Sequence, residues 1–332
     1  MPRPYKGEYL ERALELAERG RGTTRPNPVV GAVLVRDGEV VGEGWHERAG
    51  GPHAEVVALE AAGQRARGAT LYVSLEPCAH HGRTPPCADA VVAAGVSRVV
   101  AAVADPNPET ATRGFARLRE ANVEVELPGG EIERRARRQN EAWRTWVAKK
   151  RPFVTYKAAL TLDGRLAAAS GDARWVSGQE SRRLVHELRA ASDAVAVGMG
   201  TVRAENPQLT ARHVEAPRQP RRLAFGHGPL PEGSELELVE GPLEEALSRL
   251  AEEEVQSLLL EGGPTLAGAF LRAGLIDKLL LFVAPKLVGG DDAPPLFAGA
   301  GARTLADAVA LHGLEASPVG DDVQLTAYVN EP

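Results

Sequence analysis

The stretch from Ala69 to Val96 decides the fold of the N-terminal half, and it reads ATLYVSLEPCAHHGRTPPCADAVVAAGV. Its first seven residues predict a buried strand, and the segment that begins at Cys87 predicts a helix. The next segments, SRVVAAVAD and FARLREANV, repeat this order of strand and helix. Because strands that alternate with helices usually pair in parallel, we expect a parallel sheet here with helices on its faces.

Three further elements precede this stretch. EYLERALELAERG has apolar residues at helical spacing and ends at Gly20, so it predicts a helix. VVGAVLVRDGEVVGEGW consists of two β-rich runs around Asp37 and Gly38, a dipeptide typical of a β-hairpin. PHAEVVALEAA, from Pro52 to Ala62, predicts a second helix whose apolar side chains pack inward.

Composition limits the class of protein. The chain has 332 residues, enough for two domains of about 150 residues each. Its net charge of −6 argues against a protein that coats nucleic acid, but allows binding of a phosphorylated small molecule. The sequence has no apolar run near the roughly 20 residues that span a bilayer, and its N-terminus lacks the apolar core of a signal peptide. We therefore expect a cytoplasmic protein without a membrane partner, and leave open whether it forms a homo-oligomer.

The boundary between the two halves falls in EIERRARRQNEAWRTWVAKKR, which we interpret as one basic amphipathic helix that ends at Arg151. This helix is either a solvated connection between domains or a binding element. We expect domains at residues 1–147 and 148–332. Strands and helices alternate again in the second half, with Ser177 as the N-cap of one helix, and DDVQLTAYV closes the chain as a strand. GMGTVRAENP and NPQLTAR read as polar loops, so the second half is also an α/β domain.

Two polar clusters in the first half indicate chemistry. His53 and Glu55 open the second predicted helix, and Cys78 and Cys87 are the two cysteines of the chain. In a reducing compartment such cysteines are more often metal ligands or catalytic groups than a disulfide. One His and two thiolates leave a tetrahedral position on Zn²⁺ open for water, whose pKa zinc lowers to about 7. A carboxylate that is not a ligand, here Glu55, can then move protons from that water to a leaving amine.

Alternatives to a catalytic zinc site stay open at this point. His80 or His81 could supply a fourth ligand and make the zinc structural, and the His53–Glu55 pair could be a solvated helix start. Residues i and i+2 also point to opposite sides of a helix, so these two groups converge only if the metal lies beyond the helix N-terminus. Cys87 opens its own helix, whose dipole favours a thiolate.

Three segments, PNPVVGAVLV, GWHERAGGPHAEVVAL and LYVSLEPCAHHGRTPPCADAVVAAGV, closely resemble the bifunctional riboflavin-biosynthesis deaminase/reductase family in this order and spacing. The deaminase domain of that family is cytidine deaminase-like, so the resemblance implies a three-layer α/β/α domain. It implies Glu55 as the proton shuttle and one zinc ion per chain, held by His53, Cys78 and Cys87.

The resemblance also implies substrate contacts in the first half. Asn27 and His46 match family positions that hold the substrate, although by themselves they read as a turn former and a surface residue at a strand end. Arg83 lies in the polar loop between the cysteines. Its side chain is either a phosphate ligand or a solvated charge.

The second half has a weaker signal of its own. It lacks the G-x-G-x-x-G pattern of a dinucleotide-binding fold. LLLEGGPTLAGAF instead runs from an apolar strand into Gly262 and Gly263 before a helix, where backbone amides can approach a phosphate. A simple tight turn between strand and helix is an equally good interpretation.

KAALTLDGRLAAASGDARWVSG, VGMGTVRAENPQLTAR and LLLEGGPTLAGAFL resemble the reductase domain of the same family, which is similar in fold to dihydrofolate reductase and uses NADPH. The resemblance implies cofactor contacts from Trp175, Thr201, Glu205, Gly263, Pro264, Thr265 and Leu266. It implies contacts to a phosphorylated sugar substrate from Lys157, Ala173, Arg189, Leu209, Arg212 and Glu261. Relatives often carry Ser at position 173 and Asp at 205, which puts the Ala173 contact most in doubt.

The resemblance therefore implies two consecutive reactions. The first half would deaminate a phosphoribosylated diaminopyrimidinone, and the second would reduce the ribosyl group of the product to ribityl with NADPH. We keep three alternatives: a deaminase that acts on tRNA or another nucleic acid, a zinc-stabilised binding or scaffold protein, and an active deaminase with a degenerate reductase domain. The acidic pI of about 5.8 and the eight residues between the cysteines oppose the first.

Overall fold

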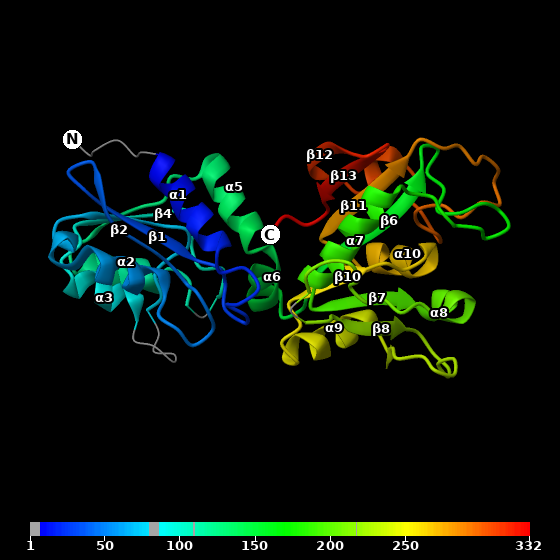
Figure 1. The fold of residues 1–332 in the computed structure, drawn as a ribbon, viewed down its shortest axis with the longest axis horizontal. Coiled ribbons are helices and arrows are strands. Elements are labelled where there is room, and N and C mark those ends of the chain that lie inside the picture. The colour runs from blue at the N-terminus through cyan, green and yellow to red at the C-terminus, as the bar shows by residue number, and fades with distance from the viewer. Residues whose placement is uncertain (1–6, 80–85, 109, 217) are drawn as a thin grey trace. The chain divides into compact units, whose positions relative to one another are not determined.

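The computed structural model describes residues 7–79, 86–108, 110–216 and 218–332. The chain divides into two compact units, Met1–Lys149 and Lys150–Pro332. Figure 1 shows one sheet with its helices in each unit.

Among the described residues, the first unit contains a five-stranded sheet in the order β2-β1-β3-β4-β5. Its strands are β1 (Gly31–Arg36), β2 (Glu39–Trp45), β3 (Thr70–Val73), β4 (Arg98–Ala101) and β5 (Glu124–Glu126). Its helices are α1 (Gly7–Glu18), α2 (Ala54–Ala62), the 3₁₀ turn η1 (Gly63–Ala66), α3 (Cys87–Ala93), α4 (Arg113–Glu120), α5 (Gly130–Gln139) and α6 (Glu141–Lys149). The predicted hairpin is present as β1 and β2, and β3, β4 and β5 pair in parallel as expected. The pairs β1–β2 and β1–β3 are antiparallel, so the sheet is mixed.

Helices cover both faces of this sheet because its strands are apolar on both sides. Ala32 and Leu34 of β1 pack with α2, α3 and α4, whereas Val33 and Val35 pack with α1 and α5. Figure 1 shows α2 and α3 on one side of the sheet and α1 and α5 on the other. Helix α2 lies very close to β2, since a Cβ on Gly42 would be 2.3 Å from the carbonyl oxygen of Ala58 in α2. The first unit is therefore the expected three-layer α/β/α domain.

The second unit, in the part that the structure describes, contains an eight-stranded sheet in the order β12-β13-β11-β6-β10-β7-β8-β9. Its strands are β6 (Phe153–Thr161), β7 (Ala194–Gly198), β8 (Arg221–Phe225), β9 (Glu237–Val239), β10 (Ser257–Leu260), β11 (Lys278–Ala284), β12 (His312–Val319) and β13 (Asp322–Tyr328). Its helices are α7 (Gln179–Ala191), α8 (Met199–Glu205), α9 (Leu243–Glu252), α10 (Pro264–Arg272) and the 3₁₀ turn η2 (Leu305–Asp307). Strands β11 to β9 pair in parallel, and β13 and β12 add an antiparallel edge. Helices α9 and α10 pack on one face, and α7 and α8 on the other.

Several local predictions were wrong. The segment predicted as one helix before Arg151 forms two, α5 and α6, which are separated at Asn140. Gly178 rather than Ser177 precedes α7. Residues from Met199 to Glu205 form α8 instead of a loop, because Met199 and Val202 are buried in the core. Strand β12 was not predicted, since its residues are almost all exposed and leave no alternation of buried and exposed positions to read.

None of the helices in the described ranges combines the length and the hydropathy that a bilayer crossing requires.

Candidate functional site

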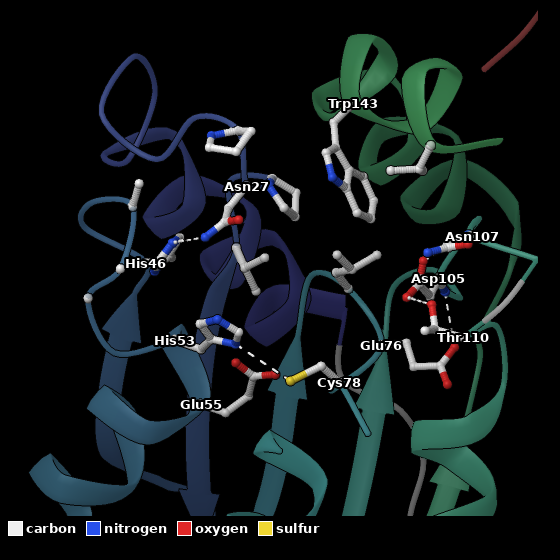
Figure 2. Close-up of a pocket in the computed structure, with 18 residues that line it drawn as sticks. Asn27, His46, His53, Glu55, Glu76, Cys78, Asp105, Asn107, Thr110 and Trp143 are labelled. Carbon is white, nitrogen blue, oxygen red and sulfur yellow. Dashed lines mark hydrogen bonds between the residues drawn. The ribbon is translucent and has the colours of Figure 1, made fainter. Parts of the chain in front are cut away.

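A cavity of about 390 Å³ lies in the first unit at the carboxyl ends of β3 and β4. Its lining includes the expected residues Asn27, His46, His53, Glu55 and Cys78. Figure 2 shows these side chains gathered on one side of the cavity, with Asp105, Asn107 and Thr110 on the other. The cavity therefore brings together segments that are far apart in the sequence.

Three side chains form the arrangement of a metal site: His53 and Cys78 line this cavity, and the buried Cys87 lies next to them. The ligand atoms of His53, Cys78 and Cys87 all lie within 4.8 Å of one another. Nδ1 of His53 is 3.1 Å from Sγ of Cys87 and 3.6 Å from Sγ of Cys78. Tetrahedral zinc with ordinary bond lengths places nitrogen and sulfur ligands about 3.5 Å apart, so these distances fit the ion. A set of one imidazole and two thiols also matches the donor types that zinc prefers.

Local structure explains why His53 and Glu55 both face the site. His53 is the extended residue that precedes α2, with φ −77° and ψ 161°, whereas Glu55 lies in the first turn. The geometric objection to an i, i+2 pair therefore disappears, because His53 is outside the helix. Cys87 opens α3, and its backbone N–H donates to Sγ of Cys78 at 3.3 Å.

The electrostatics of the cluster favour a thiolate and a proton carrier. A hydrogen bond from Cys87, together with the contact to His53, lowers the pKa of the Cys78 thiol to about 4. The hydrogen bond to Cys78 and burial raise the pKa of Cys87. Burial, with the nearby charge of Cys78, raises the pKa of Glu55 to about 7. A carboxyl group with a pKa near neutrality can both accept and donate a proton in one cycle.

Asn27 and His46 form the rim beside this cluster. Nδ1 of His46 lies 2.9 Å from the carbonyl oxygen of Pro52, which can only accept, so Nδ1 carries the proton. Nε2 then accepts from the side-chain amide of Asn27 at 3.1 Å. Burial lowers the pKa of His46, in agreement with a neutral ring. The side-chain oxygen of Asn27, Oδ1, can accept a hydrogen bond from a ligand in the cavity.

Some expected residues cannot be placed. Arg83, and the alternative fourth ligands His80 and His81, lie outside the described residues. Their predicted roles stay predictions.

Sequence reasoning missed the opposite rim, which Glu76 organises. The buried Glu76 carboxylate accepts hydrogen bonds from the backbone N–H groups of Asp105, Thr112 and Phe115. Asp105 in turn accepts from the hydroxyl of Thr110 at 2.8 Å. Asp105 follows β4 as Cys78 follows β3, so polar residues after neighbouring parallel strands were a usable signal for this rim.

The second unit has a larger cavity, of about 1010 Å³. Its lining contains most of the residues expected there from the family resemblance: Lys157, Ala173, Trp175, Arg189, Thr201, Glu205, Arg212, Glu261, Gly263 and Pro264. Thr265, Leu266 and Leu209 are not among the residues that line it. Thr265 is exposed, Leu266 packs against the core, and Leu209 is buried.

A buried ion-pair cluster occupies one end of this second cavity. Glu261 accepts from Nζ of Lys157 at 3.3 Å and from Nε and Nη2 of Arg189 at 2.6 and 3.0 Å. Burial opposes ionisation of Glu261, but the charges of Lys157 and Arg189 outweigh it and lower its pKa to about 2. The cluster carries a net positive charge and suits an anionic ligand.

Further basic residues at this cavity were not predicted. Arg182, Arg183, His186 and His213 also line it. The guanidinium of Arg182 lies 4.5 Å from the centroid of the Trp175 ring, which is 64% exposed and ready to contact a ligand. The spacing of Arg182 and His186 on one face of α7 was the available signal.

Family models match both units. The model of the cytidine and deoxycytidylate deaminase zinc-binding region matches residues 5–103, and that of the RibD C-terminal domain matches residues 152–325. The riboflavin biosynthesis protein RibD of Escherichia coli (strain K12) is 42% identical over 360 residues, which cover 96% of this chain and 97% of the relative. The chain belongs to the RibD family.

Other RibD relatives support this assignment along the whole chain. RibD of Aquifex aeolicus (strain VF5) is 41% identical over 87% of this chain and 89% of the relative. The structure of Acinetobacter baumannii RibD is 38% identical, with a TM-score of 0.85, and covers 97% of this chain and 98% of that one. A Thermotoga maritima structure described as a diaminohydroxyphosphoribosylaminopyrimidine deaminase/5-amino-6-(5-phosphoribosylamino)uracil reductase is 35% identical, with a TM-score of 0.81 and coverage of 97% of both chains.

Membership of the RibD family decides against two of the three alternatives. The chain is a bifunctional deaminase/reductase enzyme of riboflavin biosynthesis that acts on small molecules and uses Zn²⁺ and NADPH. The predictions of a cytidine deaminase-like first domain and a reductase second domain are confirmed. The readings as a nucleic-acid deaminase and as a scaffold protein are thereby set aside.

Proposed function

We propose that the first unit converts 2,5-diamino-6-(5-phosphoribosylamino)pyrimidin-4(3H)-one and water into 5-amino-6-(5-phosphoribosylamino)uracil and ammonia. The bond from C2 of the pyrimidine to its amino nitrogen breaks, and a bond from C2 to the water oxygen forms. The observation that carries the proposal is that the buried Glu55 lines the cavity together with His53 and Cys78, whose ligand atoms lie within 4.8 Å of that of Cys87.

In this proposal each residue has one task. His53, Cys78 and Cys87 hold zinc, which when bound supplies a Lewis acid that activates water. Glu55 takes a proton from the attacking water and delivers protons to the ring and to the leaving amine. Asn27, oriented by the neutral His46, binds the pyrimidine, and Arg83 contacts the phosphate.

We propose that the second unit then reduces the ribosyl group of the uracil product to ribityl. A hydride passes from NADPH to C1′ of the opened sugar, a proton is taken up, and NADP⁺ leaves. Trp175, Thr201, Glu205 and the segment from Gly263 to Leu266 would hold NADPH. The phosphorylated sugar would be held by Lys157, Ala173, Arg189, Leu209, Arg212 and Glu261. The net positive charge of the Lys157–Glu261–Arg189 cluster supports an anionic substrate there.

We assign deamination to residues 1–147 and reduction to residues 148–332. The cytoplasmic location stays a prediction from the sequence, and the oligomeric state stays open. Full activity of the reductase also stays a prediction, in view of Ala173 and Glu205.

The test is one assay on the purified, zinc-loaded chain with the diaminopyrimidinone and NADPH. We expect one ammonia released and then one NADPH oxidised per substrate. Glu55→Gln should keep zinc and the fold but lower ammonia release about 10²–10⁴-fold, while it still oxidises NADPH with the uracil intermediate supplied. Unchanged ammonia release by Glu55→Gln contradicts the role of Glu55. NADPH oxidation that is absent even with the intermediate means a degenerate reductase.

A further inference from the structure

Helix α6 is a wall of the deaminase cavity rather than a solvated connection. Trp143 and Val147 both line the cavity, and Figure 2 shows the indole of Trp143 directed toward it from α6. Their i, i+4 spacing places them on one face of the helix. Asn140 immediately precedes the helix, and its carbonyl oxygen accepts from the backbone N–H of Arg144 at 2.9 Å. One face of this segment therefore points to the proposed deaminase site.

Asn140 makes two hydrogen bonds to a single residue 111 positions earlier in the chain. Its Oδ1 accepts from the backbone N–H of Val29 at 2.9 Å, and its Nδ2 donates to the carbonyl oxygen of Val29 at 2.9 Å. The Asn140 side chain thus pairs with both the N–H and the C=O group of the Val29 backbone, as a neighbouring strand would. Asn140 is 8% exposed, so water cannot easily replace these bonds.

Val29 connects this anchor to the rim of the cavity. Pro26, Asn27 and Pro28 line the cavity and immediately precede Val29. The two prolines lack N–H groups, so few backbone donors fix this loop. The N–H of Asn27 donates to Thr24, and the N–H of Val29 donates to Asn140.

The next residue extends the connection to the His46 side of the rim. The carbonyl oxygen of Val30 accepts from the backbone N–H of His46 at 2.9 Å. Asn27 and His46 then contact each other through their side chains. A displacement of Val29 would therefore shift both Asn27 and His46.

Helix α6 also contacts the opposite rim. Nη1 of Arg144, which is 7% exposed, donates to the carbonyl oxygen of Ala104 at 3.3 Å. Ala104 precedes Asp105, whose side chain lines the cavity. The segment 140–144 is thus joined to both rims, through Asn140 just before the helix on one side and Arg144 within it on the other.

We propose that α6 braces the deaminase cavity and that Asn140 is a positioning residue for the reaction, since it holds Asn27 in place through the backbone of Val29. The proposal rests on the proposed function of this cavity. The Asn140 side chain bonds to the backbone of Val29, which leads to the substrate-binding Asn27, so it acts on how the substrate is held rather than on proton transfer.

Asn140→Asp is the sharpest test because it keeps the shape and the acceptor. The new oxygen faces the carbonyl oxygen of Val29 and repels it, so the loop should shift. A lost hydrogen bond of this kind corresponds to about a ten-fold change in an equilibrium. We expect KM of the deamination to rise about ten-fold, with kcat changed less than about three-fold, one zinc per chain, and an unchanged rate of NADPH oxidation with the uracil intermediate.

Asn330→Asp is the matched control. Nδ2 of Asn330 donates to the carbonyl oxygens of Gly274 and Ile276, so this variant makes the same chemical change within the second unit. It should leave KM and kcat of the deamination as in the unchanged chain. A folded, zinc-loaded Asn140→Asp chain with unchanged KM overturns the proposal, and so does a loss confined to kcat or to zinc content.

A measurement on the unchanged chain covers the case in which Asn140→Asp does not fold. The amide of Val29 should exchange its hydrogen slowly in the zinc-loaded full-length protein, because Asn140 holds it in a buried bond. Exchange as fast as that of an exposed loop amide overturns the proposal. Absence of ammonia release by the unchanged chain contradicts the proposed function instead, and the two failures are therefore distinguishable.

Discussion

Gly114 lies so close to Pro77 that a Cβ on Gly114 would be 1.9 Å from the carbonyl oxygen of Pro77. Gly114 is in the first turn of α4, and Pro77 immediately precedes Cys78. The same approach lets Glu76 accept from the N–H of Phe115 in α4. Helix α4 thus packs against the backbone at Pro77, which leads into the proposed zinc ligand Cys78.

Gly114→Ala should disturb this support. The added methyl group meets a backbone atom, so α4 or the segment at Pro77 must move, at a cost of about 1–3 kcal/mol in the free energy of unfolding. We expect weaker zinc binding and slower ammonia release, measured by zinc titration against a chelator and by an ammonia assay. Gly301→Ala is the control, because its Cβ meets nothing within 4 Å. Equal zinc affinity in the two variants argues against a role for this contact.

Glu76→Gln should loosen the rim that contains Asp105 and Thr110. A glutamine side chain has one acceptor oxygen instead of two, and its NH₂ group faces an N–H group that has lost its partner. We expect unfolding to become easier by about 1–3 kcal/mol and KM of the deamination to increase. Chemical denaturation and steady-state kinetics measure the two effects. Glu124→Gln, which changes an exposed partner of Arg98, should have a much smaller effect. An unchanged KM in Glu76→Gln would remove the link between this carboxylate and the cavity.

Removal of zinc should separate the two activities. The ligand cluster found in the described residues lies entirely in the first unit. A chelator should therefore abolish ammonia release but leave NADPH oxidation with the uracil intermediate intact, and added zinc should restore the first reaction. Cys87→Ser should reproduce the chelated state. Loss of both activities on chelation would mean that the second reaction also depends on the metal.

Glu261→Gln should lower the stability of the second unit in a pH-dependent way. The folded pKa of about 2 lies below the ordinary 4.5, so ionised Glu261 stabilises the fold above pH 4.5, and this contribution is lost as the pH falls toward 2. The difference corresponds to about 3 kcal/mol. Denaturation of both chains should show the largest gap at pH 6 and a shrinking gap below pH 4.5. A gap that does not change with pH contradicts the ion-pair explanation. Glu244→Gln, at an exposed position of α9, is the control.

Much of the fold could be predicted because its signals are local. The hairpin at Asp37 and Gly38 and the strand–helix order after Ala69 follow from turn chemistry and hydrophobic periodicity, and both are present. The helix break at Asn140 could not be predicted, because Asn is tolerated in a helix. The bonds that hold Asn140 outside the helix are made to Val29, which is distant in the sequence. Strand β12 could not be predicted either, because its residues are almost all exposed and show no alternation of buried and exposed positions.

The sequence by itself determined which residue types are available for the proposed metal site. His53, Cys78, Cys87 and Glu55 are recognisable because residue type and spacing set which atoms can bind zinc or carry protons. The tertiary structure alone decided how that chemistry is supported. Asn140 on Val29, Arg144 on Ala104 and Gly114 on Pro77 each join segments whose approach depends on how helices pack against the sheet. Packing of this kind arises from many distant contacts at once, and no local pattern of residues encodes it.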